Sequence, residues 1–413
     1  MVKTNIQIFY DSSTNVYAPG QLVHGNVIIE LEEEMKARAV VLHMVGKAVT
    51  NWSCHEHREI YTDSSGNRQT RSRTEAIKDN EVYMENKTIL WDGGADEILP
   101  EGSHRYDFSF NLPLICPPSF EGNFGYIRYY CSVKIDRPWR FDEKEISAFS
   151  VLPFFDLNTI PYSISPVMKE STKNLGFICK HGRIYARIII PKTGYVPGET
   201  IWAQIEMKNM SSRDIEGIEV SLMELSRFHG HCSYSGHGAS KTHSRLVAKS
   251  RKEVVIQGKQ TLTEQISLQV PPVVPSFNNC RIIQVDYQFK VEIEAHGFLN
   301  NSLKIEIPIL IGTYPLNNIP IDTLTDPSRA PDHLTPPQPT APPMEMDNPP
   351  PTYGESIFGP EKMENEDEDA TNFIGFKPKY RYFPLAGPTM DPISFPQGSI
   401  IEDSKSDDCC VIS

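Results

Sequence analysis

Apolar and polar residues alternate with a period of two along much of the first 315 residues. The alternation is clearest at 287–294 and 303–309, and it recurs at 218–222. A period of two places apolar side chains on one face of an extended chain, as in a half-buried strand. No window of comparable strength has the 3.6-residue period of an amphipathic helix. The pattern therefore predicts an all-β body.

One turn-plus-strand unit occurs twice in this body. Tyr17-Ala18-Pro19-Gly20-Gln21 corresponds to Tyr195-Val196-Pro197-Gly198-Glu199, and the apolar positions that follow coincide at the same offset. Proline followed by glycine suits the centre of a type II turn, because proline presets φ and glycine accepts a positive φ. The repeat predicts two copies of one structural unit.

A second correspondence lies further along the chain. Pro118-Ser119-Phe120, with Tyr129 downstream, matches Pro275-Ser276-Phe277, with Tyr287 downstream, at a smaller offset. The smaller offset fits a longer loop in the first copy, and the polar stretch 54–79 is the candidate. We therefore expect two homologous β-sandwich domains, at residues 1–168 and 169–315, followed by a tail at 316–413.

The tail differs from the body in composition. It holds 17 of the 33 prolines, and its 17 acidic against 6 basic residues give it −11 of the total charge of −13. Proline-rich, acidic segments cannot bury enough apolar surface to fold alone, so we expect the tail to be disordered. A nearly neutral body and an acidic tail also argue against nucleic-acid binding, which requires an excess of positive charge.

The sequence predicts neither a secretory signal at its start nor a membrane-spanning segment. The first residues lack the apolar run of a secretory signal, and no stretch reaches the roughly 20 apolar residues that cross a bilayer. The eight cysteines have no C-x-x-C spacing. We expect a cytoplasmic protein whose cysteines are free thiols.

Three sets of residues together resemble the arrestin fold, in its α-arrestin or arrestin domain-containing branch. They are Tyr17-x-Pro19-Gly20 with Val23 and Gly25, Val45-Gly46-Lys47-Ala48 with Trp52, and Gly194-Tyr195-x-Pro197-Gly198-Glu199. The resemblance covers about three quarters of the chain and implies two immunoglobulin-type β-sandwich lobes of seven strands joined by a short hinge. It also implies a non-enzymatic adaptor that binds membrane-protein cargo such as receptors or transporters. An unrelated pair of sandwich domains is the alternative.

The tail contains the sequence P-P-x-Y at Pro350, Pro351 and Tyr353. Proline biases this segment to polyproline II, the conformation that WW domains bind in an aromatic groove, and Tyr353 would be the specific anchor. The resemblance implies that the motif recruits a HECT-type ubiquitin ligase with WW domains. Only one such motif is intact, because 376–380 and 382–384 lack paired prolines. A proline-rich spacer with an incidental tyrosine is the alternative.

Two further tail sequences match short motifs. Pro339, Thr340, Ala341 and Pro342 resemble the P-[ST]-A-P motif bound by the ESCRT-I complex, although four residues in a proline-rich tail also arise by chance.

The terminal Cys410-Val411-Ile412-Ser413 fits the C-a-a-X prenylation pattern, and Cys409 is a candidate for palmitoylation as the second membrane anchor. An unmodified tail is the alternative, because neighbouring aspartates would be repelled by an anionic leaflet and the resemblance does not include this motif.

The remaining His, Cys and basic clusters are expected to lie in surface loops. His and Cys residues cluster at 54–57 and 229–243, but without paired cysteines we expect no metal there. Arg68, Arg71, Arg73 and Lys78 form a basic run that would suit a phosphorylated cargo tail or simply be a solvated loop. No catalytic motif is recognisable, so we expect no enzyme and no cofactor. The overall expectation is an adaptor recruited to the plasma membrane and endosomes, with a structural, retromer-like coat component as the alternative.

Overall fold

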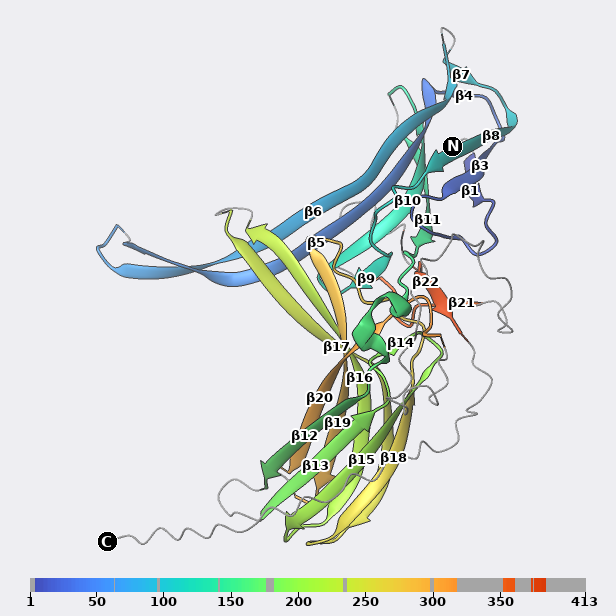
Figure 1. Ribbon diagram of the computed structural model, residues 1–413. Coiled ribbons are helices and arrows are strands. Elements are labelled where there is room, and N and C mark those ends of the chain that lie inside the picture. Colours follow the sequence, from blue (N-terminus) through green and yellow to red (C-terminus); the bar gives the residue numbers. More distant parts are fainter. Residues whose placement is uncertain are drawn as a thin grey trace, which may run out of the picture.

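The computed structural model describes residues 4–62, 64–94, 97–139, 142–175, 182–232, 236–297, 301–317, 352–360, 373 and 375–383. It shows two β-sandwich lobes, one above the other in Figure 1. Within the described residues, the helical elements are the short 3-10 turns η1 (Leu157–Thr159) and η2 (Pro161–Ile164). The prediction of an all-β body with two sandwich lobes is confirmed.

The first lobe packs two sheets against each other. One sheet has the order β1-β3-β8. The other contains β6-β5-β10-β11-β2, with β9 beside β10. The strand bounds are β1 Thr4–Tyr10, β2 Val16–Tyr17, β3 Leu22–Leu31, β4 Met35–Lys36, β5 Ala39–Thr62, β6 Arg68–Asp92, β7 Ile98–Leu99, β8 Gly102–Asn111, β9 Phe120–Gly122, β10 Gly125–Asp136 and β11 Glu143–Val151. Alternate apolar side chains of β3, such as Val23 and Val27, point into the core.

The second lobe repeats this arrangement. One sheet has the order β12-β13-β15-β18, and the other contains β14-β20-β19-β16 with β17 beside β16. The strand bounds are β12 Val167–Asn174, β13 Gly182–Ile190, β14 Gly194–Tyr195, β15 Thr200–Ser211, β16 Ile215–Cys232, β17 Gly238–Ile256, β18 Thr261–Gln269, β19 Ile283–Ala295 and β20 Ser302–Ile311. Every second residue of β19 is buried, as the alternation at 287–294 predicts.

The first sequence repeat is a structural repeat. In each lobe the Tyr-x-Pro-Gly unit follows a two-residue strand, β2 or β14, that pairs in parallel with the last long strand of the lobe, β11 or β20. Gly20 and Gly198 have φ of 78° and 101°. The amide of Gln21 donates to the carbonyl of Ala18 and that of Glu199 to Val196, both at 3.1 Å. Glycine is required at both positions because an L side chain is strained at these φ values.

The second sequence repeat is also a structural repeat, because its equivalent serines make the same hydrogen bonds in both lobes. The Ser119 amide donates to the Val151 carbonyl at 2.9 Å, and the Ser119 hydroxyl accepts from the Val151 amide at 2.9 Å. Ser276 makes the same pair of bonds with Ile311, at 2.8 and 3.0 Å. These serines fix the segment that enters the sheet interface of each lobe. The two offsets seen in the sequence therefore mark equivalent positions in two copies of one fold.

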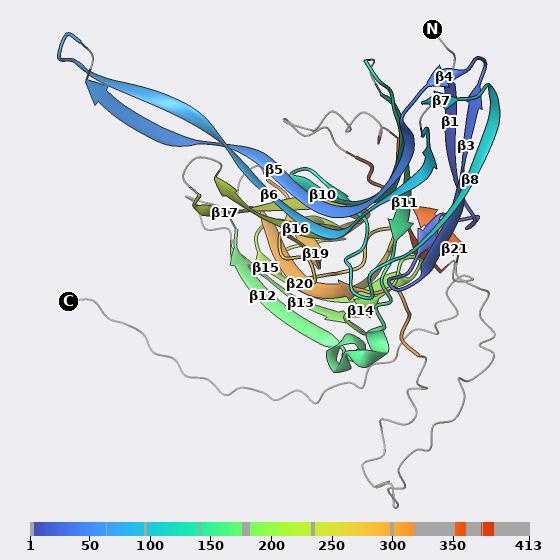
Figure 2. The same cartoon turned by 90° about the horizontal axis from the view of Figure 1, so that it is seen from above.

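The stretch 54–79 is a strand pair and not the loop that the sequence predicts. It forms the outer part of the long β5–β6 hairpin, which projects away from the body in Figures 1 and 2. Near its base, β6 pairs with β16 of the second lobe through His231 with Lys78 and Cys232 with Ile77. This pairing joins the two lobes in one continuous sheet. Antiparallel backbone pairing of β5 with β6 continues along this stretch to Thr62 with Arg68.

Two stretches of the tail also correct the sequence prediction. Residues 352–355 form β21 (Thr352–Glu355) and residues 379–382 form β22 (Lys379–Tyr382), which pair with each other between the lobes (Figure 1). The disorder expected for 316–413 therefore does not apply to these described stretches. Aromatic side chains give these stretches apolar surface to bury, although the tail as a whole is polar.

Candidate functional site: the tail hairpin between the lobes

The tail hairpin, defined as β21 and β22 with the described residues around them, contains the tyrosine of the P-P-x-Y sequence. Tyr353 pairs with Arg381, and Gly354 pairs with Tyr380. The Tyr353 side chain is half-buried and packs against the main hydrophobic core, whereas Thr352 and Glu355 are exposed. The candidate anchor for a WW domain is thus engaged by the protein's own body.

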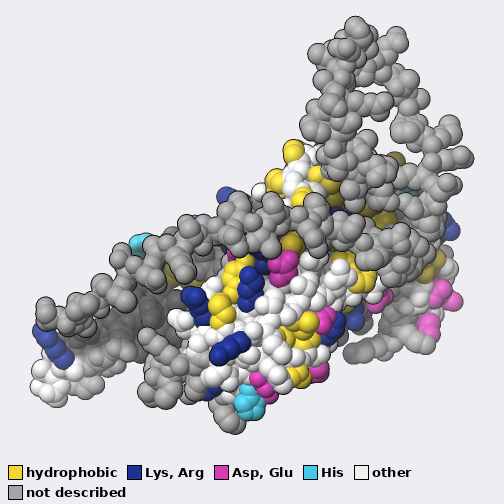
Figure 3. Space-filling view, turned by 60° about the horizontal axis from the view of Figure 1, so that its bottom comes forward, with side chains coloured by type: hydrophobic (Ala, Val, Ile, Leu, Met, Phe, Trp, Pro, Cys, Tyr) yellow, Lys and Arg dark blue, Asp and Glu magenta, His cyan; other side chains and the backbone are white. Residues whose placement is uncertain are grey.

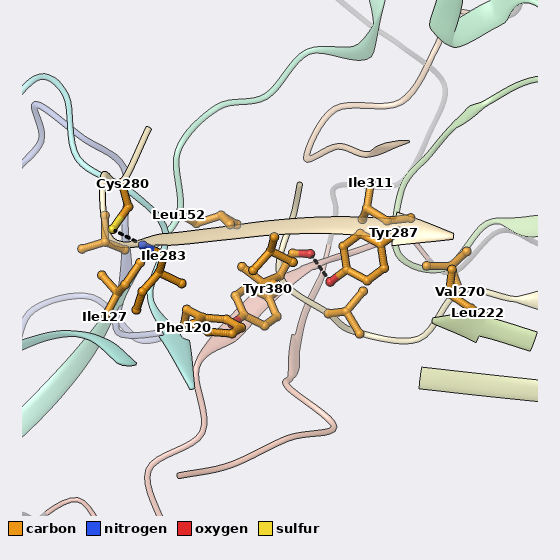
Figure 4. Packing of buried hydrophobic residues seen from close by; sticks show 14 of the residues in the cluster. Phe120, Ile127, Leu152, Leu222, Val270, Cys280, Ile283, Tyr287, Ile311 and Tyr380 are labelled. Carbon is orange, nitrogen blue, oxygen red and sulfur yellow. Dashed lines mark hydrogen bonds between the residues drawn. The ribbon is translucent and has the colours of Figure 1, made fainter. Parts of the chain in front are cut away.

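Tyr380 inserts most deeply of the tail residues around the hairpin. Its side chain is 2% exposed, and its hydroxyl donates to the carbonyl of Ser119 at 2.9 Å. Figure 4 shows the ring between Phe120 of the first lobe and Tyr287 of the second. Burial, followed by the nearby Glu224 and Glu121 carboxylates, raises the pKa of Tyr380 well above its ordinary value. The hydroxyl therefore remains a neutral hydrogen-bond donor at physiological pH.

Backbone hydrogen bonds attach the hairpin to both lobes. On the first lobe, the Lys379 amide donates to the Ser150 hydroxyl at 2.9 Å. On the second lobe, the Phe383 amide donates to the Pro197 carbonyl at 2.9 Å and the Ile357 amide to the Pro272 carbonyl at 3.3 Å. Both lobes contribute to the surface that contacts the hairpin, and we call this surface the crevice: Ser119, Ser150, Pro197 and Pro272.

A buried ion pair lies under the tail on the first lobe. Arg128 donates to Glu121 through Nε at 2.8 Å and Nη2 at 2.9 Å, and both side chains are almost inaccessible. The guanidinium lies between the rings of Tyr126, at 3.8 Å, and Phe373, at 4.6 Å. Phe373 comes from the tail and also packs on Tyr130. Cation–π contact of this kind is strongest where water is excluded, so Phe373 seals the ion pair.

A second ion pair, between the buried Glu224 and the partly buried Arg245, belongs to the second lobe. Arg245 Nη2 donates to Glu224 Oε1 at 2.7 Å, and the tail ring of Phe358 lies 3.3 Å from the guanidinium carbon. Glu224 also accepts from Ser226 and Tyr287, at 3.0 and 3.3 Å. The tail therefore places one aromatic ring on a guanidinium of each lobe.

Two glycines permit the close approach of the hairpin. A Cβ on Gly354 would lie 2.6 Å from Cγ of Pro272, and a Cβ on Gly198 would lie 2.0 Å from the Phe383 carbonyl oxygen. Real Cβ atoms do not approach this closely. Gly198 therefore has two functions: it closes the turn of the second lobe and admits the end of β22.

The structure locates only part of the predicted motif set. Tyr353 is described, whereas Pro350 and Pro351 lie outside the described residues. The P-[ST]-A-P residues Pro339, Thr340, Ala341 and Pro342, and the lipidation candidates Cys409 and Cys410, also lie outside them. Sequence reasoning missed Phe358, Phe373 and Tyr380. Their signal is weak, namely isolated aromatic residues in an acidic, proline-rich segment.

The His and Cys clusters do not gather around a common point in the described part of the chain. His229 Nδ1 contacts the Ser240 hydroxyl at 2.8 Å, and His231 Nδ1 contacts Asp79 Oδ2 at 3.0 Å. No group of three metal-ligating side chains occurs among the described residues. The side chains of Cys54, His55 and His57, like those of Arg71 and Arg73, lie outside that set.

Basic, acidic and apolar side chains are interspersed over the described part of the face in Figure 3. None of the helices within the described residues has the length and apolar character needed to cross a membrane.

Comparison with known proteins identifies both lobes. Residues 6–158 match the family model "Arrestin (or S-antigen), N-terminal domain", and residues 180–316 match "Arrestin (or S-antigen), C-terminal domain". Arrestin domain-containing protein 17 of Caenorhabditis elegans is 32% identical over 315 residues, covering 75% of this chain and 70% of that protein. Arrestin domain-containing protein 4 of Homo sapiens is 30% identical, covering 76% and 72%. Arrestin domain-containing protein 1 of Rattus norvegicus is 26% identical, covering 80% and 69%.

Proposed function

The chain belongs to the arrestin family of adaptors, and from this premise we propose that it links membrane-protein cargo to a HECT-type ubiquitin ligase with WW domains. The two lobes bind the cytosolic part of a receptor or transporter, and the tail binds the ligase. Ubiquitination is then catalysed by the ligase, while the adaptor raises the local concentration of cargo. The adaptor itself needs no catalytic residue and no cofactor.

The observation that carries this proposal is the P-P-x-Y sequence at Pro350, Pro351 and Tyr353 behind two arrestin lobes. Paired prolines predispose the segment to polyproline II, which lowers the entropy cost of docking in a WW groove. The tyrosine two positions later gives the segment a specific aromatic anchor. A single motif, without a second linked site, gives modest affinity because avidity is absent.

Two tail sequences extend the proposal. Pro339-Thr340-Ala341-Pro342 would contact ESCRT-I, and a lipid on Cys410, supported by one on Cys409, would hold the adaptor on membranes. Together they support a cytoplasmic protein that is recruited to the plasma membrane and endosomes, where it acts in endocytosis and sorting of cargo.

The test is calorimetric titration of a peptide spanning residues 336–359 into a WW domain from a HECT-type ligase. We expect micromolar binding by the wild-type peptide, loss of binding with Tyr353→Ala, and unchanged binding with Phe358→Ala, an aromatic control outside the motif. Absence of binding by the wild-type peptide would overturn the proposal. A retromer-like scaffold that needs no ligase motif would then become the leading function.

A further inference from the structure

We infer that the crevice between the lobes is a binding site for the tail hairpin, and that its occupation by the hairpin excludes a WW domain from Tyr353. The crevice and the ligase then compete for the same tail segment. This inference rests on the proposed function, because it assigns a second, intramolecular partner to the proposed ligase motif.

The two bound forms of Tyr353 are incompatible. In the hairpin, the Tyr353 ring packs against the hydrophobic core of the protein, and its backbone pairs with Arg381 in an antiparallel ladder. A WW domain requires the same ring in its own groove and the motif in polyproline II conformation. One ring cannot lie in two grooves, and a strand paired on β22 cannot also lie in the WW groove.

The hairpin is a specific occupant of the crevice and not a loosely lying segment. Three aromatic side chains around it each meet a separate feature of the body: Tyr380 donates to Ser119, Phe373 covers Arg128, and Phe358 covers Arg245. Tyr380 and Phe373 are 2% and 4% exposed. Burial of that much aromatic surface, with paired backbone groups, favours the docked form.

Competition has a measurable signature. If only a fraction of molecules have the motif released, the apparent dissociation constant equals the intrinsic constant divided by that fraction. The isolated peptide has no crevice and reports the intrinsic constant. We expect the full chain to bind the WW domain at least about tenfold more weakly than the peptide, which corresponds to release in at most about a tenth of the molecules.

The first variant releases the hairpin from the β22 side. Tyr380→Ala removes the buried ring and its hydrogen bond to Ser119 and leaves every residue of the P-P-x-Y sequence unchanged. Titrated against the same WW domain, the full-length variant should recover most of the affinity of the peptide. Lys377→Ala is the matched control, because this tail side chain is exposed and its removal should leave the affinity of the full chain unchanged.

The second variant releases the hairpin from the β21 side. Gly354→Ala places a Cβ where Pro272 already lies, so the docked strand is obstructed. The same substitution in the 336–359 peptide measures any direct effect on WW binding. We expect the full-length variant to gain affinity and the peptide variant to bind as before. This variant also keeps the test decisive if Tyr380→Ala fails to fold, which a thermal unfolding curve would reveal.

The outcomes separate the two proposals. A peptide that does not bind overturns the proposed function, and the competition falls with it. A peptide that binds, together with a full chain of equal affinity, overturns the competition and leaves the proposed function standing. A weaker full chain whose affinity neither variant raises also overturns it, because the hairpin is then not the obstacle.

Discussion

Two guanidinium groups, one buried and one partly buried, show how single residues couple the tail to the lobes. Arg128 is held by Glu121 and Arg245 by Glu224, and each guanidinium faces one tail aromatic ring. A buried ion pair is costly to assemble, because desolvation offsets most of its attraction. A ring on the guanidinium excludes water, and at Arg245 it does so although Nε and Nη1 have no hydrogen-bond partner among the described residues. The tail thus completes charge pairs that belong to the body.

Burial of the Arg128–Glu121 pair leads to a prediction about the free energy of unfolding. Glu121→Ala leaves an uncompensated buried charge, so the free energy of unfolding should fall by about 3 to 5 kcal/mol. The control is Asp142→Ala, which breaks the largely exposed Lys134–Asp142 pair and should cost less than about 1 kcal/mol. Urea titration of both variants measures the difference. Equal losses would show that the buried pair contributes no more than the surface pair.

Burial of the cysteines leads to a prediction about alkylation of their thiols. The four cysteines whose side chains are described as free thiols are Cys116, Cys131, Cys232 and Cys280, all buried. Burial raises the pKa of Cys116 to about 11 and that of Cys131 to about 12.

Because the thiolate is the reactive form, neither thiol should be alkylated in the native protein at pH 8, whereas both should react in urea. Peptide mass mapping after iodoacetamide treatment measures this. Labelling of native Cys131 at the rate of the unfolded chain would contradict it.

At the scale of elements, the same turn serves two purposes in the two lobes. Gly20 and Gly198 occupy equivalent turns with positive φ, but only the turn at Gly198 also accommodates the carbonyl of Phe383. A Cβ on Gly20 would instead meet the tip of the Leu114 side chain, at 2.9 Å. A flexible side chain can move aside, whereas a backbone carbonyl in a docked strand cannot.

This difference defines a matched pair of variants. Gly20→Ala should lower the free energy of unfolding by about 1 to 2 kcal/mol, the cost of a positive φ for an L residue, and Gly198→Ala should lower it further because it also removes the contacts of β22. Only Gly198→Ala should also raise the affinity of the full chain for a WW domain, because it expels β22. Denaturant titration and calorimetry of both variants test this. A gain in WW affinity with Gly20→Ala would mean that general destabilisation, and not hairpin release, exposes the motif.

The sequence predicts the lobes better than it predicts the tail, for a physical reason. Alternation and turn chemistry are local, so 287–294 and Pro19-Gly20 carry their structure in a few neighbouring residues. Docking of the tail depends on partners that are distant in sequence: Tyr380 and Ser119 are 261 residues apart. A lone tyrosine gives no sign of such a partner. The outer β5–β6 hairpin differs from the predicted loop because the stretch 54–79 is polar and lacks the alternation by which a strand is recognised in the sequence.

At the scale of the whole molecule, the lobes are joined in two independent ways. The β6–β16 pairing makes one sheet continuous across them, and the tail hairpin bonds to both lobes. The β6–β16 junction consists of two residue pairs, and the hairpin adds strands of four residues each. The hairpin contains Tyr353, so it is the junction that WW binding would open under the proposed competition.

Reciprocity of linked equilibria gives the last prediction. If release of the hairpin favours WW binding, WW binding must favour release by the same factor. Saturating WW domain should therefore accelerate hydrogen exchange at the amides of Lys379 and Phe383, which bond to the body and lie outside the P-P-x-Y sequence.

Exchange in β19 should stay unchanged, because that strand is paired on both sides within the second lobe. The full chain with Tyr353→Ala provides the control, since its exchange should not respond to the WW domain. Unchanged exchange at Lys379 and Phe383 under saturation would mean that the ligase motif and the docked strand β22 are uncoupled. The tail hairpin would then stay docked on the lobes, and the WW domain would bind the motif without displacing the hairpin.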